Sequence, residues 1–174
     1  IGEDDYRADY NCGTGFHSRY DRLYIQNVET YYDDWDGREE QMLYYTGAPL
    51  KDDIEVTGHP VIDLKFSCSE RDCSFYVYLS EITDKGKSIY VTEGVFRALH
   101  RKQIQSPDDD CRMDPDHTFK REDAELLVPF QPAEVCYKLL PTSYLFRKGN
   151  RIRFSIALAD RDHFSRIPDG RLPR

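Results

Sequence analysis

Side chains that could act as a nucleophile, a general base or a general acid are spread along the whole sequence. An α/β-type serine hydrolase needs a G-x-S-x-G elbow, which exposes the serine hydroxyl beside an oxyanion hole. None of the serines has these neighbours, and Ser143, between Thr142 and Tyr144, suits a turn-forming hydroxyl. A triad assembled from distant segments leaves no signature in sequence spacing. We therefore predict no catalytic residue in this chain and keep an independent enzyme as an alternative.

The five cysteines and five histidines lack the spacing of a zinc site. Zinc ligands normally occur as close pairs such as C-x-x-C or H-x-x-x-H. The residues of these two types are Cys12, Cys68, Cys73, Cys111, Cys136, His17, His59, His100, His117 and His163. An odd number of cysteines leaves one thiol over in any disulfide scheme, and we interpret the set as the reduced thiols of a cytoplasmic protein. One bridge, such as Cys68 with Cys73, is the alternative.

Two acidic runs could offer oxygen ligands to a hard cation. Calcium prefers several carboxylate and carbonyl oxygens on a tight turn. The runs are Asp34-x-Asp36-Gly37, and Asp108 to Asp110 followed by Asp114 and Asp116. Neither has the full EF-hand spacing that ends in Glu, so we interpret both as solvated acidic loops. We predict no metal site and no other cofactor.

An aromatic cluster near the N-terminus suggests a different chemistry, the binding of sugars. Trp35, Tyr31 and Tyr32 could stack on the apolar face of a sugar ring while Asp34 and Asp36 accept hydrogen bonds from its hydroxyl groups. The same rings could instead fasten this segment to the body of the protein. A surface rich in tyrosine could also pack against another domain. A carbohydrate-binding module is therefore an alternative function.

The charge balance limits the classes of partner. The chain has 174 residues with 32 acidic and 24 basic side chains, which gives a formal net charge of −8. This charge disfavours phosphate backbones and anionic membrane surfaces. No stretch approaches the ~18 apolar residues of a membrane span, and the acidic start does not resemble a signal peptide. We expect no nucleic-acid or membrane partner, and nothing here predicts an oligomeric state.

The elements that must position these side chains are short strands. Apolar and polar residues alternate from Ile62 to Phe66 and from Ile152 to Leu158, with the period of two that a half-buried strand requires. The second of these strands should face the core. Phe75 to Ile82 is apolar or aromatic at nearly every position, which predicts a strand that is covered on both faces.

A hairpin and a long crossover complete the predicted body. A turn at Asp84 to Lys87 leads into a strand from Ser88 to Leu99, in which Gly94 predicts a bulge. Gln103 to Pro132 holds four prolines and an acidic run, so we predict a crossover there, with one turn of helix at Lys120 to Leu127. No longer segment sustains a period of 3.6 residues.

This pattern predicts an all-β protein with two antiparallel sheets packed face to face in a jelly-roll or Greek-key arrangement. A closed barrel is the lesser alternative. Residues 1–40 are polar and weakly periodic, and we interpret them as a linker segment packed on the sandwich. Residues 41–174 would form the β-sandwich, so that the whole chain is one domain.

Four sequence motifs occur in an order that resembles a known family. They are YTGAPL at 45–50, DIEVTGHP at 53–60, YVTEG at 90–94 and LLPTSYLFRKGNRIR at 139–153. A central hairpin, Phe75-x-Val77-x-Leu79 followed by Asp84-x-Gly86, adds a fifth. Together they resemble the C-terminal domain of the X-prolyl dipeptidyl-peptidase and cocaine-esterase group of serine hydrolases. One departure is Asn150, where the group usually has histidine.

The resemblance implies a fold, a partner and a set of site residues. The fold would be a jelly roll of the galactose-binding-domain-like type, downstream of an α/β-hydrolase domain of the same parent chain that carries the catalytic triad. The matching residues are strand and turn elements, so the resemblance transfers no catalytic residue. In this group the early loops approach the active-site entrance. The corresponding candidates at the entrance or domain interface are Gly13, Thr14, Gly15, Tyr20, Asp21 and Arg22.

Overall fold

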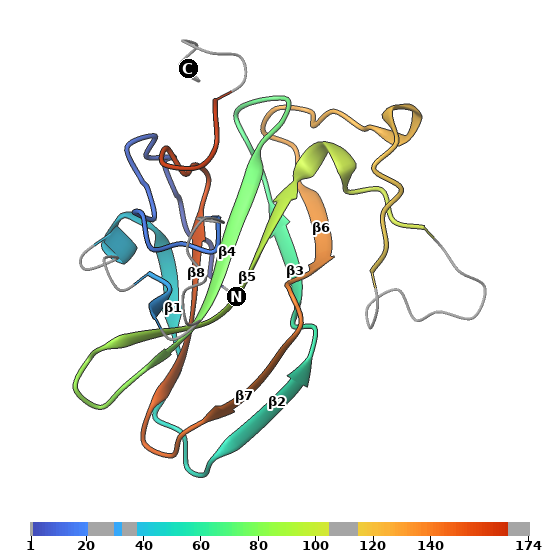
Figure 1. The fold of residues 1–174 in the computed structure, drawn as a ribbon. Coiled ribbons are helices and arrows are strands. Elements are labelled where there is room, and N and C mark those ends of the chain that lie inside the picture. The colour runs from blue at the N-terminus through green and yellow to red at the C-terminus, as the bar shows by residue number, and fades with distance from the viewer. Residues whose placement is uncertain (1, 21–29, 33–37, 105–114, 167–174) are drawn as a thin grey trace.

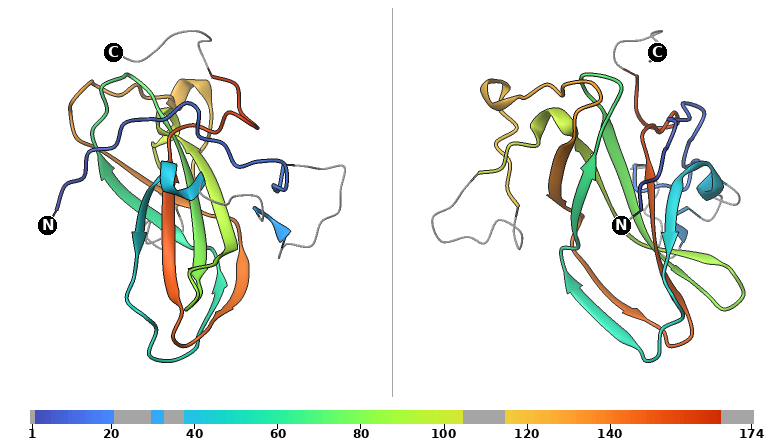
Figure 2. Two further views of the ribbon diagram at one scale, coloured as in Figure 1. Left: turned by 90° about the vertical axis from the view of Figure 1, so that its left-hand side faces the viewer. Right: turned by 180° about the vertical axis from the view of Figure 1, so that it is seen from behind.

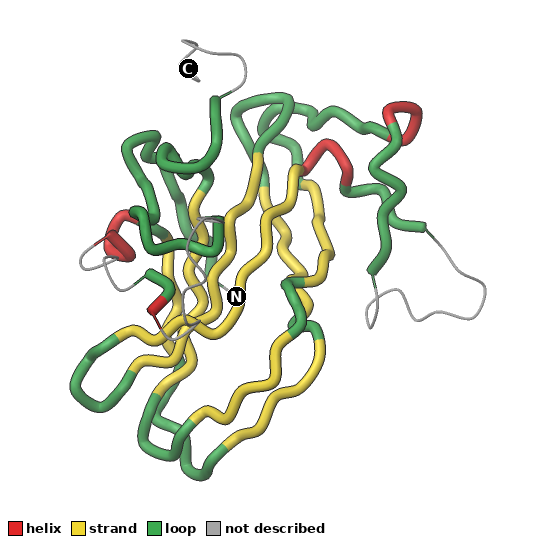
Figure 3. Tube along the Cα trace, viewed as in Figure 1, coloured by secondary structure: helices red, strands yellow, loops and turns green. Residues whose placement is uncertain are grey.

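A computed structural model describes residues 2–20, 30–32, 38–104 and 115–166 of the chain. Strands dominate these residues, and their helices are single 3-10 turns (Figures 1 and 3). No helix among them has the length and apolar character needed to cross a bilayer. The elements are η3 (Arg38–Gln41), β1 (Leu43–Thr46), β2 (Ile54–Gly58), β3 (Val61–Phe66), β4 (Ser74–Ile82), β5 (Ser88–Arg97), η4 (Ala98–His100), η5 (Arg121–Asp123), β6 (Ala133–Lys138), β7 (Thr142–Phe146) and β8 (Arg151–Ala157).

The strands form two layers. One layer is a four-stranded antiparallel sheet in the order β1-β8-β4-β5. The other consists of the antiparallel pairs β2-β7 and β3-β6, which lie opposite this sheet (Figure 2). The pairing is nested, because β1 pairs with β8, β2 with β7, β3 with β6 and β4 with β5. The prediction of an antiparallel β-sandwich is confirmed.

The second layer is one two-stranded ribbon with a bend, and we call it the bent ribbon. His59 and Pro60 connect β2 directly to β3, and 139–141 connect β6 to β7. At the bend, the Leu139 N–H donates to the Pro60 carbonyl at 2.8 Å, and the His59 ring lies 2.9 Å from the Leu139 carbonyl. The Leu140 N–H donates to the Glu93 carbonyl at 2.9 Å, which ties the bend to β5.

Strand β4 is covered on both faces, as its apolar sequence predicts. Phe75 and Val77 belong to the core between the two layers, where Phe66 and Tyr137 also pack. The intervening side chains, led by Tyr76 and Tyr78, point to the other face of the sheet. The buried residues that pack there are Cys12, Tyr32, Met42 and Ala157. The N-terminal segment therefore covers the outer face of the four-stranded sheet.

The predicted bulge at Gly94 is wrong. Gly94 pairs in register with Val77, and the register shift falls between Leu79 and Ser80 instead. A glycine stands at position 94 because the bent ribbon approaches β5 closely there. A Cβ atom on Gly94 would lie 2.7 Å from Leu139 Cδ2 and 3.2 Å from Leu139 Cα.

Two further expectations need correction. The predicted turn of helix at Lys120 to Leu127 is only the 3-10 turn η5, three residues long. On β8, Ile156 lies in the core as predicted, whereas Phe154 points toward the space between the layers but remains 37% exposed, because the layers do not close over it. Its neighbour Ser155, on the opposite face, is fully buried and donates to Glu39 Oε1 at 2.8 Å. The outer face of β8 is thus covered at Ser155.

We expect Gly94→Ala to lower the free energy of unfolding by about 1–3 kcal/mol, because the new methyl group would collide with Leu139. Urea unfolding followed by circular dichroism measures this loss. Gly47→Ala is the matched control, since a Cβ there would meet only the Ile152 carbonyl oxygen at 3.5 Å. Equal stability of the two variants would contradict close packing of the ribbon on β5.

Candidate functional site

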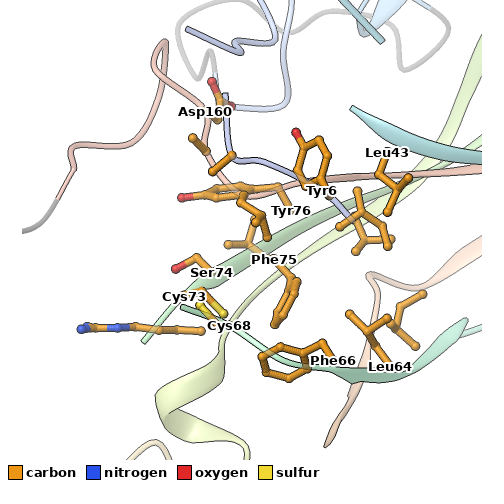
Figure 4. Close-up of a pocket in the computed structure, with 18 of the residues that line it drawn as sticks. Tyr6, Leu43, Leu64, Phe66, Cys68, Cys73, Ser74, Phe75, Tyr76 and Asp160 are labelled. Atoms are coloured by element: carbon orange, nitrogen blue, oxygen red, sulfur yellow. The ribbon is translucent and has the colours of Figure 1, made fainter. Parts of the chain in front are cut away.

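An open groove lies between the two layers, and we call it the interlayer groove. Its volume is about 2440 Å³. Figure 4 shows Tyr6 and Leu43 on one side of it, and Leu64 and Phe66 on the other. Phe154 also lines this space. Apolar side chains such as Leu64, Phe66 and Phe154 line the part of the groove that continues the core outward, and charged residues such as Asp4 and Lys65 also border it.

The first residues of the chain form one rim of the interlayer groove. The Tyr6 hydroxyl donates to the Gln41 carbonyl at 3.0 Å, and the Tyr45 hydroxyl donates to Asp4 Oδ2 at 2.8 Å. Burial, followed by the nearby charges of Cys12 and Asp9, raises the pKa of Tyr6 to about 12. These contacts fix where the N-terminus meets the sandwich, at the rim of the interlayer groove.

The candidates Gly13, Thr14 and Gly15 lie together in a contact between the two ends of the chain. We call this contact of residues 12–20 with residues 157–164 the terminal seam. The buried Thr14 hydroxyl donates to Asp160 Oδ2 at 2.9 Å, and the Gly15 N–H donates to Asp162 Oδ2 at 2.8 Å. A Cβ on Gly13 would lie 2.2 Å from Asp162 Oδ2, so a larger residue there would displace the Asp162 side chain.

The electrostatics of the terminal seam favour the ionised form of Asp162. Burial would raise the pKa of Asp162, but the Gly15 N–H and the charges of Arg38 and Arg161 outweigh it and lower this pKa. Asp160, which is 2% exposed, also accepts the Asp162 N–H at 3.1 Å. Each buried oxygen therefore has a donor, which is the condition under which a carboxylate can be buried at modest cost.

A serine–histidine pair lies within the terminal seam, and its geometry argues against catalysis. Ser18 Oγ is 2.5 Å from His163 Nε2. However, Ser18 is only 1% exposed, and His163 Nδ1 is buried without a hydrogen-bond partner among the described residues. A catalytic histidine needs an orienting acid on this nitrogen and a substrate-accessible nucleophile. This pair has neither and serves to join the two ends of the chain.

Tyr20 closes the terminal seam from the side. Its ring packs edge-on against His163 and Phe164, with centroid distances of 5.2 Å and 5.1 Å. Burial, followed by the charge of Glu93, raises the pKa of Tyr20 above its usual value. Asp21 and Arg22, the remaining predicted candidates, lie outside the described residues.

A buried carboxylate on β5, Glu93, is surrounded by tyrosine rings, and we call Glu93 with Tyr32, Tyr78 and Tyr90 the tyrosine cluster. Glu93 is 1% exposed, and it accepts a hydrogen bond from the Tyr32 hydroxyl. The Arg19 guanidinium lies 3.5 Å from Glu93 Oε1. Tyr32 packs against the rings of Tyr78 and Tyr90, with centroid distances of 5.6 Å and 5.1 Å.

Burial dominates the protonation equilibria of the tyrosine cluster. It raises the pKa of Glu93, against the opposing effects of the Tyr32 hydrogen bond and the Arg19 charge. Burial and the Glu93 charge raise the pKa of Tyr32, Tyr78 and Tyr90 above the usual value of a phenol. A small pocket of about 380 Å³ borders Glu93 and is lined by Arg19 and Tyr20. Arg19 already supplies the cation that the carboxylate requires.

The structure excludes Tyr32 from the predicted sugar-binding residues. Tyr32 is 4% exposed, so it cannot offer a ring face to a sugar. Tyr31 packs edge-on against Tyr90, with a centroid distance of 5.7 Å. Trp35 lies outside the described residues, as do both acidic runs apart from Asp116. Among the described residues, no group of three metal-ligating side chains comes together.

Sequence reasoning missed the buried acids that organise the fold. Glu81 accepts hydrogen bonds from the Tyr144 hydroxyl and the Arg147 N–H, each at 2.6 Å, and from Asn150 Nδ2 at 3.0 Å. Asn150, the departure from the family pattern, thus keeps a structural role. The sequence does offer a signal for such acids, namely a glutamate within a strand whose other residues are mostly apolar or aromatic. Glu81 in β4 and Glu93 in β5 both fit this description.

The fold and the site together define a class of protein. The described residues form a β-sandwich whose serine–histidine pair is buried and whose ionised groups hold segments of the chain together. Residues 20–173 match the family described as the X-Pro dipeptidyl-peptidase C-terminal non-catalytic domain. The chain belongs to this family.

Relatives support the assignment and show that the family occurs within longer proteins. The chain is 40% identical over 167 residues to inferred serine esterases of Mycobacterium bovis and Mycobacterium tuberculosis. The aligned residues cover 96% of this chain. It is 24% identical over 127 residues to cocaine esterase of a Rhodococcus species. The chain spans about a quarter of the length of the curated relatives it matches, 27% for the two mycobacterial proteins.

Solved structures agree with the fold. A CocE/NonD family hydrolase of Staphylococcus aureus aligns with a TM-score of 0.61 at 18% identity, over 78% of this chain and 26% of that one. An α-amino acid ester hydrolase aligns with a TM-score of 0.61 at 17% identity, over 83% of this chain and 23% of that one. At these identities the likeness concerns the fold alone.

We expect Thr14→Val to lower the free energy of unfolding by about 1.5–3 kcal/mol, because Asp160 would lose a donor in a buried site. Urea unfolding measures the change. Thr57→Val is the matched control, since the Thr57 hydroxyl pairs with Ser143 at an exposed position. If both variants are equally stable, the terminal seam does not hold the two ends of the chain in solution.

We expect stability to fall as the pH rises above about 10, the ordinary value at which the tyrosines of the unfolded chain lose their protons. The raised pKa values of Tyr32 and Tyr78 keep these phenols protonated in the folded state, so their contribution is complete below that pH and decreases above it. Denaturant unfolding from pH 8 to pH 12 measures this slope. Tyr32→Phe should flatten it, whereas Tyr44→Phe, on an exposed ring, should leave it unchanged. An unchanged slope in Tyr32→Phe would contradict the burial of its hydroxyl.

Proposed function

We propose that this domain packs on an α/β-hydrolase domain of the same parent chain and shapes the entrance to its active site. The parent would cleave acyl bonds, as an esterase or an X-Pro dipeptidyl-peptidase. The observation that carries this proposal is the span of the chain, which matches a C-terminal non-catalytic domain and about a quarter of its curated relatives. A domain of this kind leaves the nucleophilic chemistry to its neighbour.

The proposed docking surface is the loop that the terminal seam holds in place. Phe16, between Gly15 and His17, is 80% exposed, although its neighbours Thr14 and Ser18 are each 1% exposed. A large apolar side chain at the tip of a rigid loop suits contact with another domain. Gly13, Thr14 and Gly15 would position Phe16, and Tyr20 would extend the same surface. Asp21 and Arg22 remain predictions for this entrance.

We further propose that the sandwich is a jelly roll of the galactose-binding-like type. The nested strand pairing supports this assignment, because a jelly roll results when one long antiparallel hairpin is rolled up. The additional pairing of β4 with β8 joins the outermost and innermost pairs of that hairpin into one sheet.

An esterase is favoured over a dipeptidyl-peptidase as the parent activity. The relatives that are 40% identical are named as serine esterases, and cocaine esterase is similar over 73% of this chain. The reduced thiols of Cys12, Cys68 and Cys73 support a reducing compartment, and we propose the cytoplasm. The carbohydrate-binding alternative is not proposed, because the ring of Tyr32 is buried.

The test compares this chain with its full-length parent on a chromogenic acyl ester. We expect no turnover by this chain, and turnover by the parent. Ser18→Ala in the parent should keep kcat within about two-fold, because Ser18 is a structural residue; loss of a catalytic serine costs about 10⁶-fold in kcat. Turnover by this chain, or a large loss of kcat in Ser18→Ala without loss of folded protein, would contradict the proposal.

A further inference from the structure

Two cysteines meet where the chain crosses from one layer of the sandwich to the other. β3, in the bent ribbon, ends at Phe66, and β4, in the four-stranded sheet, begins at Ser74. Cys68 and Cys73 lie on the connection between them and border the interlayer groove. Figure 4 shows the two sulfur atoms side by side at the edge of this groove, and the thiols hydrogen-bond to each other.

The backbone around the two cysteines is already fixed on both sides. The Cys68 carbonyl accepts the Phe130 N–H at 2.8 Å, and the Cys73 carbonyl accepts the Ala98 N–H at 2.9 Å. These hydrogen bonds anchor the connection at each of the two cysteines. A disulfide requires Cβ atoms about 3.5–4.5 Å apart, so it forms between thiols that are already neighbours.

We propose that Cys68 and Cys73 are a redox-active pair that forms a reversible disulfide with a hydroperoxide as the oxidant. The bond would tie the two layers together at the edge of the interlayer groove. In the reduced state, described here, both side chains are free thiols. The pair would thus give the accessory domain a stiffer, oxidised form and a looser, reduced form.

The surroundings assign different roles to the two sulfur atoms. Cys68 Sγ accepts the Glu70 N–H at 3.3 Å in addition to the Cys73 thiol. The hydrogen bond from Cys73 and the Glu70 N–H lower the pKa of Cys68 to about 6, whereas the hydrogen bond to Cys68 and burial raise the pKa of Cys73. Cys68 is therefore the thiolate that attacks the oxidant, and Cys73 keeps its proton until the second step.

The reaction balances with one hydroperoxide for each disulfide. The Cys68 thiolate attacks one peroxide oxygen, the O–O bond breaks, and the departing hydroxide or alkoxide takes up a proton as water or alcohol. This leaves a sulfenic acid on Cys68. The Cys73 sulfur then attacks the Cys68 sulfur, the S–S bond forms, the S–O bond breaks, and the proton of Cys73 leaves with the hydroxide as water. A dithiol reductant reverses the oxidation.

The test treats the full chain with one equivalent of hydrogen peroxide and maps its cysteines by mass spectrometry. Arg71 lies between the two cysteines, so trypsin yields two peptides, 66–71 and 72–85, that only a disulfide can hold together. We expect this joined pair, lighter by two hydrogens than its reduced components, and its separation by a dithiol. Peptides that stay separate, or a bridge that involves another cysteine, would overturn the proposal.

Single variants separate a redox pair from two thiols that merely pack together. In Cys73→Ser, the sulfenic acid on Cys68 has no partner, and a 1,3-dione probe should trap it; in Cys68→Ser, Cys73 should stay unlabelled. Cys12→Ser is the matched control, because Cys12 is buried elsewhere, and it should form the bridge as wild type does. Equal labelling in the two single variants would contradict the assigned roles.

Two further readouts follow from the geometry. At pH 7, Cys68 should react with iodoacetamide at least about ten-fold faster than Cys12, whose pKa is raised by burial to about 11. Oxidation should raise the Tm of the wild type by about 5 °C, because it closes a loop that joins the layers, and it should leave the Tm of Cys68→Ser unchanged. Equal alkylation rates, or the same Tm before and after oxidation, would count against the proposal.

Discussion

The structure depends on one close approach, that of the bent ribbon to β5. At this point Gly94 has no side chain, and Leu139 occupies the space that a Cβ atom would need. The backbones are then near enough for the Leu140 N–H to donate to the Glu93 carbonyl, and for the Thr92 hydroxyl to donate to the Leu140 carbonyl at 2.8 Å. A larger residue at 94 would displace Leu139 and strain both bonds.

The same strand also determines how the N-terminal segment is held. Successive side chains of a strand point to opposite faces, so Gly94 faces the ribbon while the neighbouring Glu93 faces the segment that covers the other side of the sheet. There Glu93 accepts a hydrogen bond from Tyr32 and pairs with Arg19. Two adjacent residues of β5 thus connect the bent ribbon, the sheet and the N-terminal segment.

The amino-acid sequence predicts the strands better than it predicts their contacts. The alternation of apolar and polar residues from Ile62 to Phe66 identifies β3, and the apolar run from Phe75 to Ile82 identifies β4. Both patterns can be recognised because they depend only on which faces of the strand are buried. A glycine within a strand signals either a bulge or a close approach, and only the three-dimensional structure decides between them, as at Gly94. Asp160 and Thr14 are 146 residues apart, so no local pattern reveals their hydrogen bond.

The buried polar groups of the terminal seam connect the two ends of the described chain. An enzyme leaves a reactive serine accessible, but here Ser18 and Asp160 are sealed from solvent. Ser18 pairs with His163, and Asp160 accepts hydrogen bonds from the Thr14 hydroxyl and the Asp162 N–H. Burying such groups contributes little net stability, because desolvation offsets much of the hydrogen-bond energy. These hydrogen bonds instead fix the geometry, because each bond restricts the position of the acceptor relative to its donor. That geometry holds the N-terminal segment on the sandwich, both at Tyr6 and at the terminal seam.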